Sequence, residues 1–152
     1  MESKVLQIQQ LDQRISDYSG LEKVAPPVEG WIKTIRTALG MSMQQLGKRL
    51  SVTKQSVKAL EAREQQGTLT INALRDAANA LDMHLVYGFV PNDGSLEELI
   101  ERRAMELARQ IVLRTDNTMR LEDQENTRSR IEKSIKERAA MIRNEMPRVL
   151  WD

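Results

Sequence analysis

A short run of hydrogen-bonding side chains near residue 55 has the chemistry needed to contact the edges of DNA bases. Lysine can donate to guanine O6 and N7, and glutamine can pair with adenine N6 and N7. The residues that we expect to contact bases are Lys54, Gln55, Ser56 and Lys58. Hydroxyl, amide and cationic groups can also bond phosphates and so fix the register on a duplex. For that role the sequence offers Ser42, Gln44, Arg36, Lys48 and Thr53.

The first of two short helices that would position these side chains begins at residue 43. Ser42 is a favourable N-cap, and Gln45 stands three positions later as the partner of a capping box. Leu46 and Leu50 are four residues apart and therefore share one face. Gly47 lies between them, and its small size would let a second helix cross closely.

A tight connection at residues 51–52 leads into the second helix. We expect Val52 to turn inward and Thr53 to cap the next helix. Val57 and Leu60 would form its buried stripe, which leaves the polar and basic residues outside. The pattern favours a helix-turn-helix, whose second helix enters the major groove of DNA. The alternative is a helical hairpin with a solvated basic face.

Residues 31–81 resemble the five-helix DNA-binding domain of the Xre-type family, which includes the lambdoid phage repressors. The run TKQSVKALE, at residues 53–61, is similar to the recognition helix of that family. Two positions depart from the family pattern. Met43 stands where the family usually has Gln, and Ser51 stands where it usually has Gly. A positive φ at Ser51 would carry a steric cost.

A second resemblance covers nearly the whole chain. The segments WIKTIRTALGMSMQQLGKRL, TLTINALRDAANALDMHLVYGFVP and PRVLWD are similar to the family called mobile mystery protein A. Members of that family are often encoded beside a Fic-domain protein, which implies a toxin–antitoxin or regulatory pairing. Some Fic inhibitors carry a Ser/Thr-x-x-x-Glu-Gly/Asn motif. Its nearest match is TMRLED at residues 118–123, where Asp123 replaces the final Gly or Asn.

The distribution of charge supports a DNA-binding face. The whole chain has a net charge of +1. Residues 31–66 hold seven basic and two acidic side chains, a net charge of +5, and the rest of the chain carries −4. A local basic patch on a nearly neutral protein is the electrostatic signature of nucleic-acid binding.

Composition excludes several other classes of protein. The chain of 152 residues has no cysteine, so disulfides, thiolate catalysis and cysteine-based zinc sites are excluded. No apolar run approaches the roughly 18 residues of a membrane span, and the first residues lack the apolar centre of a signal peptide. His84 is the single histidine, and no phosphate loop or nucleophile elbow is present. We expect a cytoplasmic protein that is not an enzyme and has no cofactor and no metal site.

The predicted fold class is mostly α. A five-helix Xre-type helix-turn-helix domain is followed by one short strand and a C-terminal helical extension. We expect an N-terminal helical arm at residues 1–29, the DNA-binding domain with its terminal strand at 30–91, and the extension at 92–152.

The strand is predicted at residues 83–90, where the apolar period changes from helical to two. Leu85, Tyr87 and Phe89 would share one face. Because a lone strand has unpaired edges, we expect it to pair with the same strand of a second subunit. The alternative is an extended segment packed on its own domain.

Two apolar stripes at helical spacing mark the C-terminal extension. They comprise Leu96, Ile100, Ala104, Leu107 and Ile111, and then Ile131, Ile135, Ala139, Ile142 and Met146. The extension would either stabilise a dimer or dock another protein. For docking, the candidate residues are Ile135, Ile142 and Trp151.

Together these patterns predict a dimeric, sequence-specific DNA-binding regulator. It would bind an inverted-repeat operator in double-stranded DNA, repress its own operon and act as an antitoxin-like partner of a neighbouring Fic-domain protein. The alternative is a protein-neutralising antitoxin or adaptor that acts mainly through its C-terminal helices, with DNA binding secondary.

Overall fold

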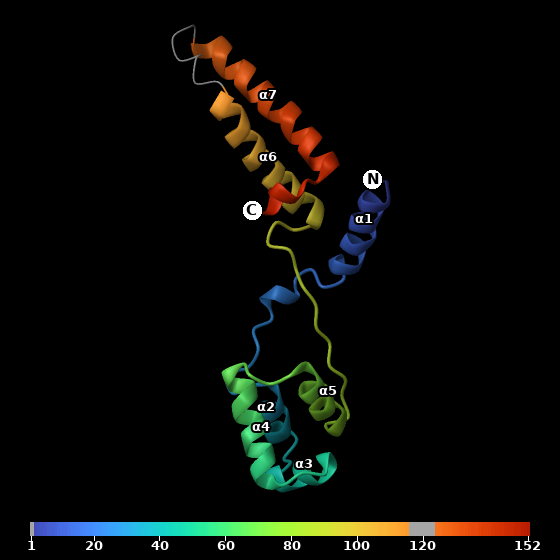
Figure 1. The fold of residues 1–152 in the computed structure, drawn as a ribbon. Coiled ribbons are helices and arrows are strands. Elements are labelled where there is room, and N and C mark those ends of the chain that lie inside the picture. Colours follow the sequence, from blue (N-terminus) through green and yellow to red (C-terminus); the bar gives the residue numbers. More distant parts are fainter. Residues whose placement is uncertain (1, 116–123) are drawn as a thin grey trace. The chain divides into compact units, whose positions relative to one another are not determined.

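A computed structural model describes residues 2–115 and 124–152 of the chain, and the elements in those ranges are helices (Figure 1). The chain divides into two compact units, each with its own hydrophobic core. One unit is Gly20–Gly88; the other combines Met1–Ser19 with Phe89–Asp152. The TMRLED segment lies outside the described residues.

The unit Gly20–Gly88 contains four α-helices, one fewer than the Xre resemblance implies. They are α2 (Trp31–Ala38), α3 (Met43–Leu50), α4 (Lys54–Gln66) and α5 (Ile71–Ala80), preceded by the short 3-10 helix η1 (Leu21–Lys23). Hydroxyl side chains cap three of the helices: Ser42 for α3, Thr53 for α4 and Thr70 for α5. The helix boundaries therefore follow the capping signals of the sequence.

The core of this unit confirms the two predicted stripes. Leu46 of α3 and Val57 of α4 are fully buried against Ile32, Ala77 and Leu81. The expectation that Val52 turns inward is wrong, because its side chain is 44% exposed.

The strand predicted at residues 83–90 is not formed. This stretch, which the structure describes in full, is extended but has no secondary structure, and Phe89 is 84% exposed. A strand exists only when its backbone groups bond to a neighbouring strand, and no described segment of the chain lies beside this one as a strand. The pairing of Leu85, Tyr87 and Phe89 with a second subunit stays a prediction.

The second unit is an antiparallel helical hairpin with an added N-terminal helix. The hairpin is α6 (Leu96–Thr115) and α7 (Gln124–Glu145), which lie side by side (Figure 1). Helix α1 (Glu2–Ser16) packs against α6, and the 3-10 helix η2 (Arg148–Trp151) folds back onto it. The structure thus groups the N-terminal helix, which the sequence predicts as an arm, with the C-terminal helices.

The apolar stripes of α6 and α7 face each other and form the core of the hairpin. Ala104, Ala108, Ile135, Ile142 and Leu150 are all buried there. Ile135 is 7% exposed and Ile142 is 5% exposed, so neither can anchor another protein. Their assignment as partner-binding residues is wrong, because each helix uses its stripe to cover the other. Trp151, the third candidate, is 53% exposed.

None of the helices in the described ranges combines the length and the apolar character that crossing a membrane requires.

Candidate nucleic-acid interface

The start of α3 is fixed by a complete capping box. The Ser42 hydroxyl accepts the Gln45 backbone N–H at 3.1 Å, and the Ser42 N–H donates to the Gln45 side chain at 2.8 Å. Two backbone donors at the helix start are satisfied in this reciprocal way. Gln44 is exposed one residue after Met43, where α3 begins.

The turn between α3 and α4 requires a small residue on α3 and strained backbone at its end. A Cβ added to Gly47 would lie 2.8 Å from the carbonyl oxygen of Val52, so only glycine allows this approach. Ser51 has φ 58°, a left-handed conformation that costs energy for a residue with a side chain. Thr53 then caps α4 by accepting the Ser56 N–H at 3.1 Å.

The residues predicted to contact bases are all exposed on α4. Each residue of an α-helix is rotated by about 100° from the one before it. Gln55 and Ala59 therefore lie almost opposite the buried Val57, at the centre of the outward face. Lys58 lies on one flank of that face and Ser56 on the other.

Ser56 is the least available of these four residues. Its Oγ accepts a hydrogen bond from the Thr53 hydroxyl at 3.0 Å. Ser56 also lines a groove bordered by Ala73 and Asp76 of α5. The groups free to meet a ligand are consequently Gln55 and Lys58 on the outward face of α4 and Lys54 at its exposed first position.

Among the phosphate candidates, Ser42, Gln44, Lys48 and Thr53 are exposed and Arg36 is not. Arg36 is 8% exposed and its guanidinium is fully engaged inside the domain. It donates to both carboxylate oxygens of Glu61, with the shortest contact 2.7 Å, and to the carbonyl oxygen of Met41 at 2.9 Å. The prediction that Arg36 contacts phosphate is therefore wrong.

The Arg36–Glu61 pair joins α2 to α4 and fixes the rotation of α4 about its axis. Both side chains are buried, at 10% and 5% exposure. Glu61 follows Val57 by four residues and so lies on the inward face of α4. A carboxylate at a core position calls for a buried cation, so the sequence signals that Glu61 has such a partner, and the structure identifies it as Arg36.

A second carboxylate of α4 caps α2. The two Glu64 oxygens accept the backbone N–H groups of Trp31 and Ile32 at 2.8 and 2.9 Å. The residue before α2 is Gly30, which has no side chain to serve as a cap. A Cβ at Gly30 would lie 2.8 Å from a Glu64 oxygen, so glycine leaves room for this carboxylate.

Exposed cations remain on α3 and α4 after these internal pairs are formed. Arg49 is occupied: it donates to the carbonyl oxygen of Ala80 at 3.0 Å and to Asp82 at 3.3 Å. Lys48, Lys54 and Lys58 form no ion pair with any residue that the structure describes. Arg63, in the last turn of α4, is also exposed and has no ion pair with a described residue, so these four side chains carry the free positive charge of α3 and α4.

Nothing in the geometry points to a metal centre. Within residues 2–115 and 124–152 there is no group of three or more side chains placed to hold a metal ion. The lone histidine, His84, is exposed in the extended segment after α5.

Comparison with known families identifies the segment that the geometry singles out. The helix-turn-helix family model matches residues 32–87, which contain nearly all of α2 and the whole of α3, α4 and α5. No curated protein and no solved structure matches the chain. The resemblance of the full chain to mobile mystery protein A stays a prediction. Residues 32–87 are therefore a helix-turn-helix domain.

Proposed function

We propose that the protein is a sequence-specific DNA-binding transcriptional regulator in which α4 is the recognition helix. One observation carries the proposal: Gln55 and Lys58 are exposed on the outward side of a helix whose inward side is locked by buried contacts, and Lys54 is exposed at the start of that helix. Residues that contact bases must be held rigidly, because a small displacement loses the paired hydrogen bonds. The cap at Thr53 and the Arg36–Glu61 pair provide that rigidity.

The experiment is a titration of the purified protein against operator and scrambled duplexes at one salt concentration. The operator is first selected from random duplexes by the wild-type protein. Lys54→Ala and Gln55→Ala should each reduce discrimination at particular base positions by about 1–3 kcal/mol. Gln65→Ala is the matched control, because Gln65 is an exposed glutamine near the other end of α4. Unchanged discrimination in both test variants would remove α4 from the recognition role.

The regulator is proposed to act as a dimer on an inverted repeat. Helix-turn-helix dimers bind half-sites whose centres lie about 10 base pairs, or a multiple, apart. Tyr87, the last residue of the domain, and Phe89, two residues beyond it, supply apolar surface for contact between two copies, with 57% and 84% exposure. Sedimentation at micromolar concentration tests this directly. A wild-type monomer that binds one asymmetric site tightly would contradict it.

We also propose that the protein represses its own operon and acts as the partner of a neighbouring Fic-domain protein. This proposal rests on the resemblance to mobile mystery protein A. One structural feature favours a protein partner. Val149 and Trp151 are 49% and 53% exposed on η2, so an apolar surface remains after the hairpin core is complete. Trp151→Ala should abolish co-purification with the Fic-domain protein. Val28→Ala, a change at another exposed apolar residue, is the control.

Binding rather than catalysis is the activity that we infer. The lysines and glutamine on α4 are hydrogen-bond donors suited to bases and phosphates. The proposed site uses no nucleophile and no cofactor. Such a protein acts where the DNA is, which agrees with the expectation of a cytoplasmic location.

A further inference from the structure

Helix α1 is attached firmly to the hairpin at one end and loosely along the rest. Near its C-terminal end, Asp12 accepts the backbone N–H groups of Leu96 and Glu97 at 2.7 and 3.2 Å and so caps α6. Nearer its N-terminus, Ile8 reaches the hairpin core, but Val5 remains 46% exposed although it lies on the same side of α1. The apolar face of α1 is thus only half covered.

The incomplete contact leaves open space on both sides of Ile8. On one side a hollow of about 450 Å³ is bounded by α1, the start of α6 and the end of α7. On the other a hollow of about 300 Å³ extends to Trp151 and Lys4. Ile8, Ile100 and Met146 line both. Both hollows open to the surface, so a ligand can reach the apolar side chains that line them.

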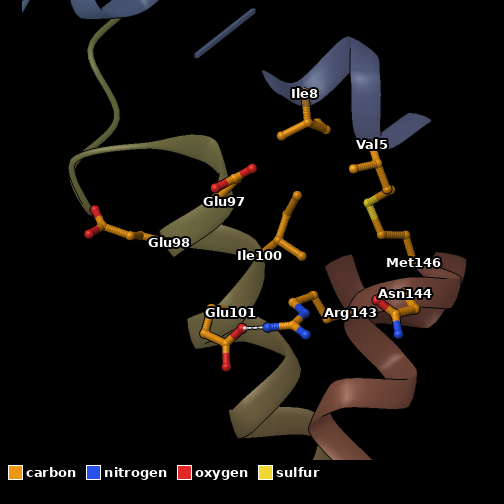
Figure 2. Close-up of a pocket in the computed structure, with 9 residues that line it drawn as sticks. All are labelled: Val5, Ile8, Glu97, Glu98, Ile100, Glu101, Arg143, Asn144 and Met146. Atoms are coloured by element: carbon orange, nitrogen blue, oxygen red, sulfur yellow. Dashed lines mark hydrogen bonds and ion pairs between the residues drawn. The ribbon is translucent and has the colours of Figure 1, made fainter. Parts of the chain in front are cut away.

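The larger space, named here the α1 hollow, has an apolar floor and an acidic rim. Figure 2 shows Val5 and Ile8 of α1 facing Ile100 and Met146 across the opening. Glu97, Glu98 and Glu101 stand on the α6 side, and Arg143 is bonded to Glu101 at 2.9 Å (Figure 2). The Glu98 carboxylate is turned away from the opening (Figure 2) and Arg143 matches Glu101, so Glu97 gives the rim its uncompensated negative charge.

We propose that the α1 hollow binds a small amphipathic organic cation. Its hydrocarbon or aromatic body would lie between Ile8, Ile100 and Met146, and its ammonium group would lie at Glu97. The volume falls in the range of about 300–1,000 Å³ that is usual for small-molecule sites, which are mostly apolar with a few polar groups. Glu97 forms no ion pair with a described residue, whereas Glu101 is matched by Arg143.

The negative charge of the rim and the three helices that form the walls favour this occupant over a second copy of the chain. The Glu97 carboxylate attracts a cation placed beside it, whereas it would repel an anion. The walls come from three separate helices of one unit, as a small ligand requires. The proposal does not depend on DNA binding, because its test contains no DNA.

The test uses the full chain and two fluorescent probes that share a naphthalene ring. Dansylcadaverine carries a primary ammonium group, and N-phenyl-1-naphthylamine is neutral. Ile8→Trp places a larger side chain in the hollow and should weaken the binding of both probes about tenfold or more. Leu6→Trp is the matched control, since Leu6 is on the opposite side of α1 and 54% exposed, and it should weaken neither.

A second variant separates charge from shape and does not disturb the packing. Glu97→Gln should weaken the binding of the cationic probe about threefold, as expected for one partly exposed ion pair. The affinity for the neutral probe should not change. Three results would overturn the proposal. They are no binding of dansylcadaverine to the wild type, equal losses in the Ile8 and Leu6 variants, or a change of oligomeric mass caused by Ile8→Trp. The last would make this face a contact between two copies.

Discussion

Arg36 of α2 and Glu61 of α4 form a buried ion pair, with Nη2 2.7 Å from Oε1, and it holds the proposed recognition helix in position. The same guanidinium also bonds the carbonyl oxygen of Met41 in the segment that leads into α3. One side chain therefore links three parts of the domain. A buried pair of this kind stabilises little relative to an apolar pair, but loss of one partner leaves an uncompensated charge.

Glu61→Ala should destabilise the domain by about 3–5 kcal/mol, because Arg36 would then be buried without its partner. The measurement is urea unfolding followed by the fluorescence of Trp31, in a Trp151→Phe background so that the signal comes from this unit. The free energy of unfolding of the double variant Arg36→Met/Glu61→Leu should fall by less than that of Glu61→Ala. Lys33→Ala is the control, because its pair with Glu29 is exposed and 3.7 Å long, and it should cost about 1 kcal/mol at most.

Glu64 should prove to be the N-cap of α2 although it lies 33 residues after Trp31. Glu64→Ala removes the acceptor of two backbone N–H groups and should cost about 0.5–2 kcal/mol. Glu64→Gln keeps an acceptor but loses the charge that favours a helix N-terminus, so its cost should be smaller. The free energy of unfolding, measured as for Glu61, ranks the two variants. An equal loss in both would mean that the charge, and not the hydrogen bonding, is the main contribution.

Lys48 should contribute to DNA affinity without contributing to discrimination. Its charge is exposed on α3 and free of ion pairs within the described part of the domain. Lys48→Ala should weaken binding to the operator and to the scrambled duplex by the same factor. It should also reduce the slope of log K against log[salt] by about 1. Arg75→Ala removes an exposed charge from α5 and serves as the control. A loss confined to the operator would instead assign Lys48 to base contacts.

The sequence predicts the parts of this fold that local signals determine. Ser42, Thr53 and the spacing of Leu46 and Val57 place the helix-turn-helix, because capping and burial act within a few residues. The small size of Gly47 also allows the close approach of the turn backbone, as the sequence predicts. These are relationships of short range, which a single sequence displays directly.

Relationships between distant residues account for the errors. A basic residue on α2 suggests a phosphate contact until the carboxylate of Glu61 is placed beside it. Ile135 and Ile142 suggest a docking face until α6 is seen to cover them. The alternation at residues 83–90 predicts a strand, but strand formation needs a partner that the pattern cannot supply. In each case the outcome depends on which segment lies opposite.

The ion pair between Asp93 and Arg102 should give the unit that contains α6 a pH-dependent contribution to stability. Arg102 donates to Asp93 at 2.7 and 3.1 Å. The hydrogen bond from Arg102 lowers the pKa of Asp93 below its ordinary value of 3.8. A carboxyl group whose pKa is lower in the folded state stabilises that state above the unfolded pKa. The contribution disappears as the pH falls through the folded pKa.

The melting temperature of the wild type should therefore exceed that of Asp93→Asn at pH 6, and the difference should shrink as the pH falls below about 4. The unfolding of this unit can be followed by Trp151 fluorescence in a Trp31→Phe background. The matched control is the same substitution in an Arg102→Met background, where the pH-dependent difference should vanish. A difference that persists there would show that Asp93 acts through a group other than Arg102. A difference that grows on acidification would contradict the lowered pKa itself.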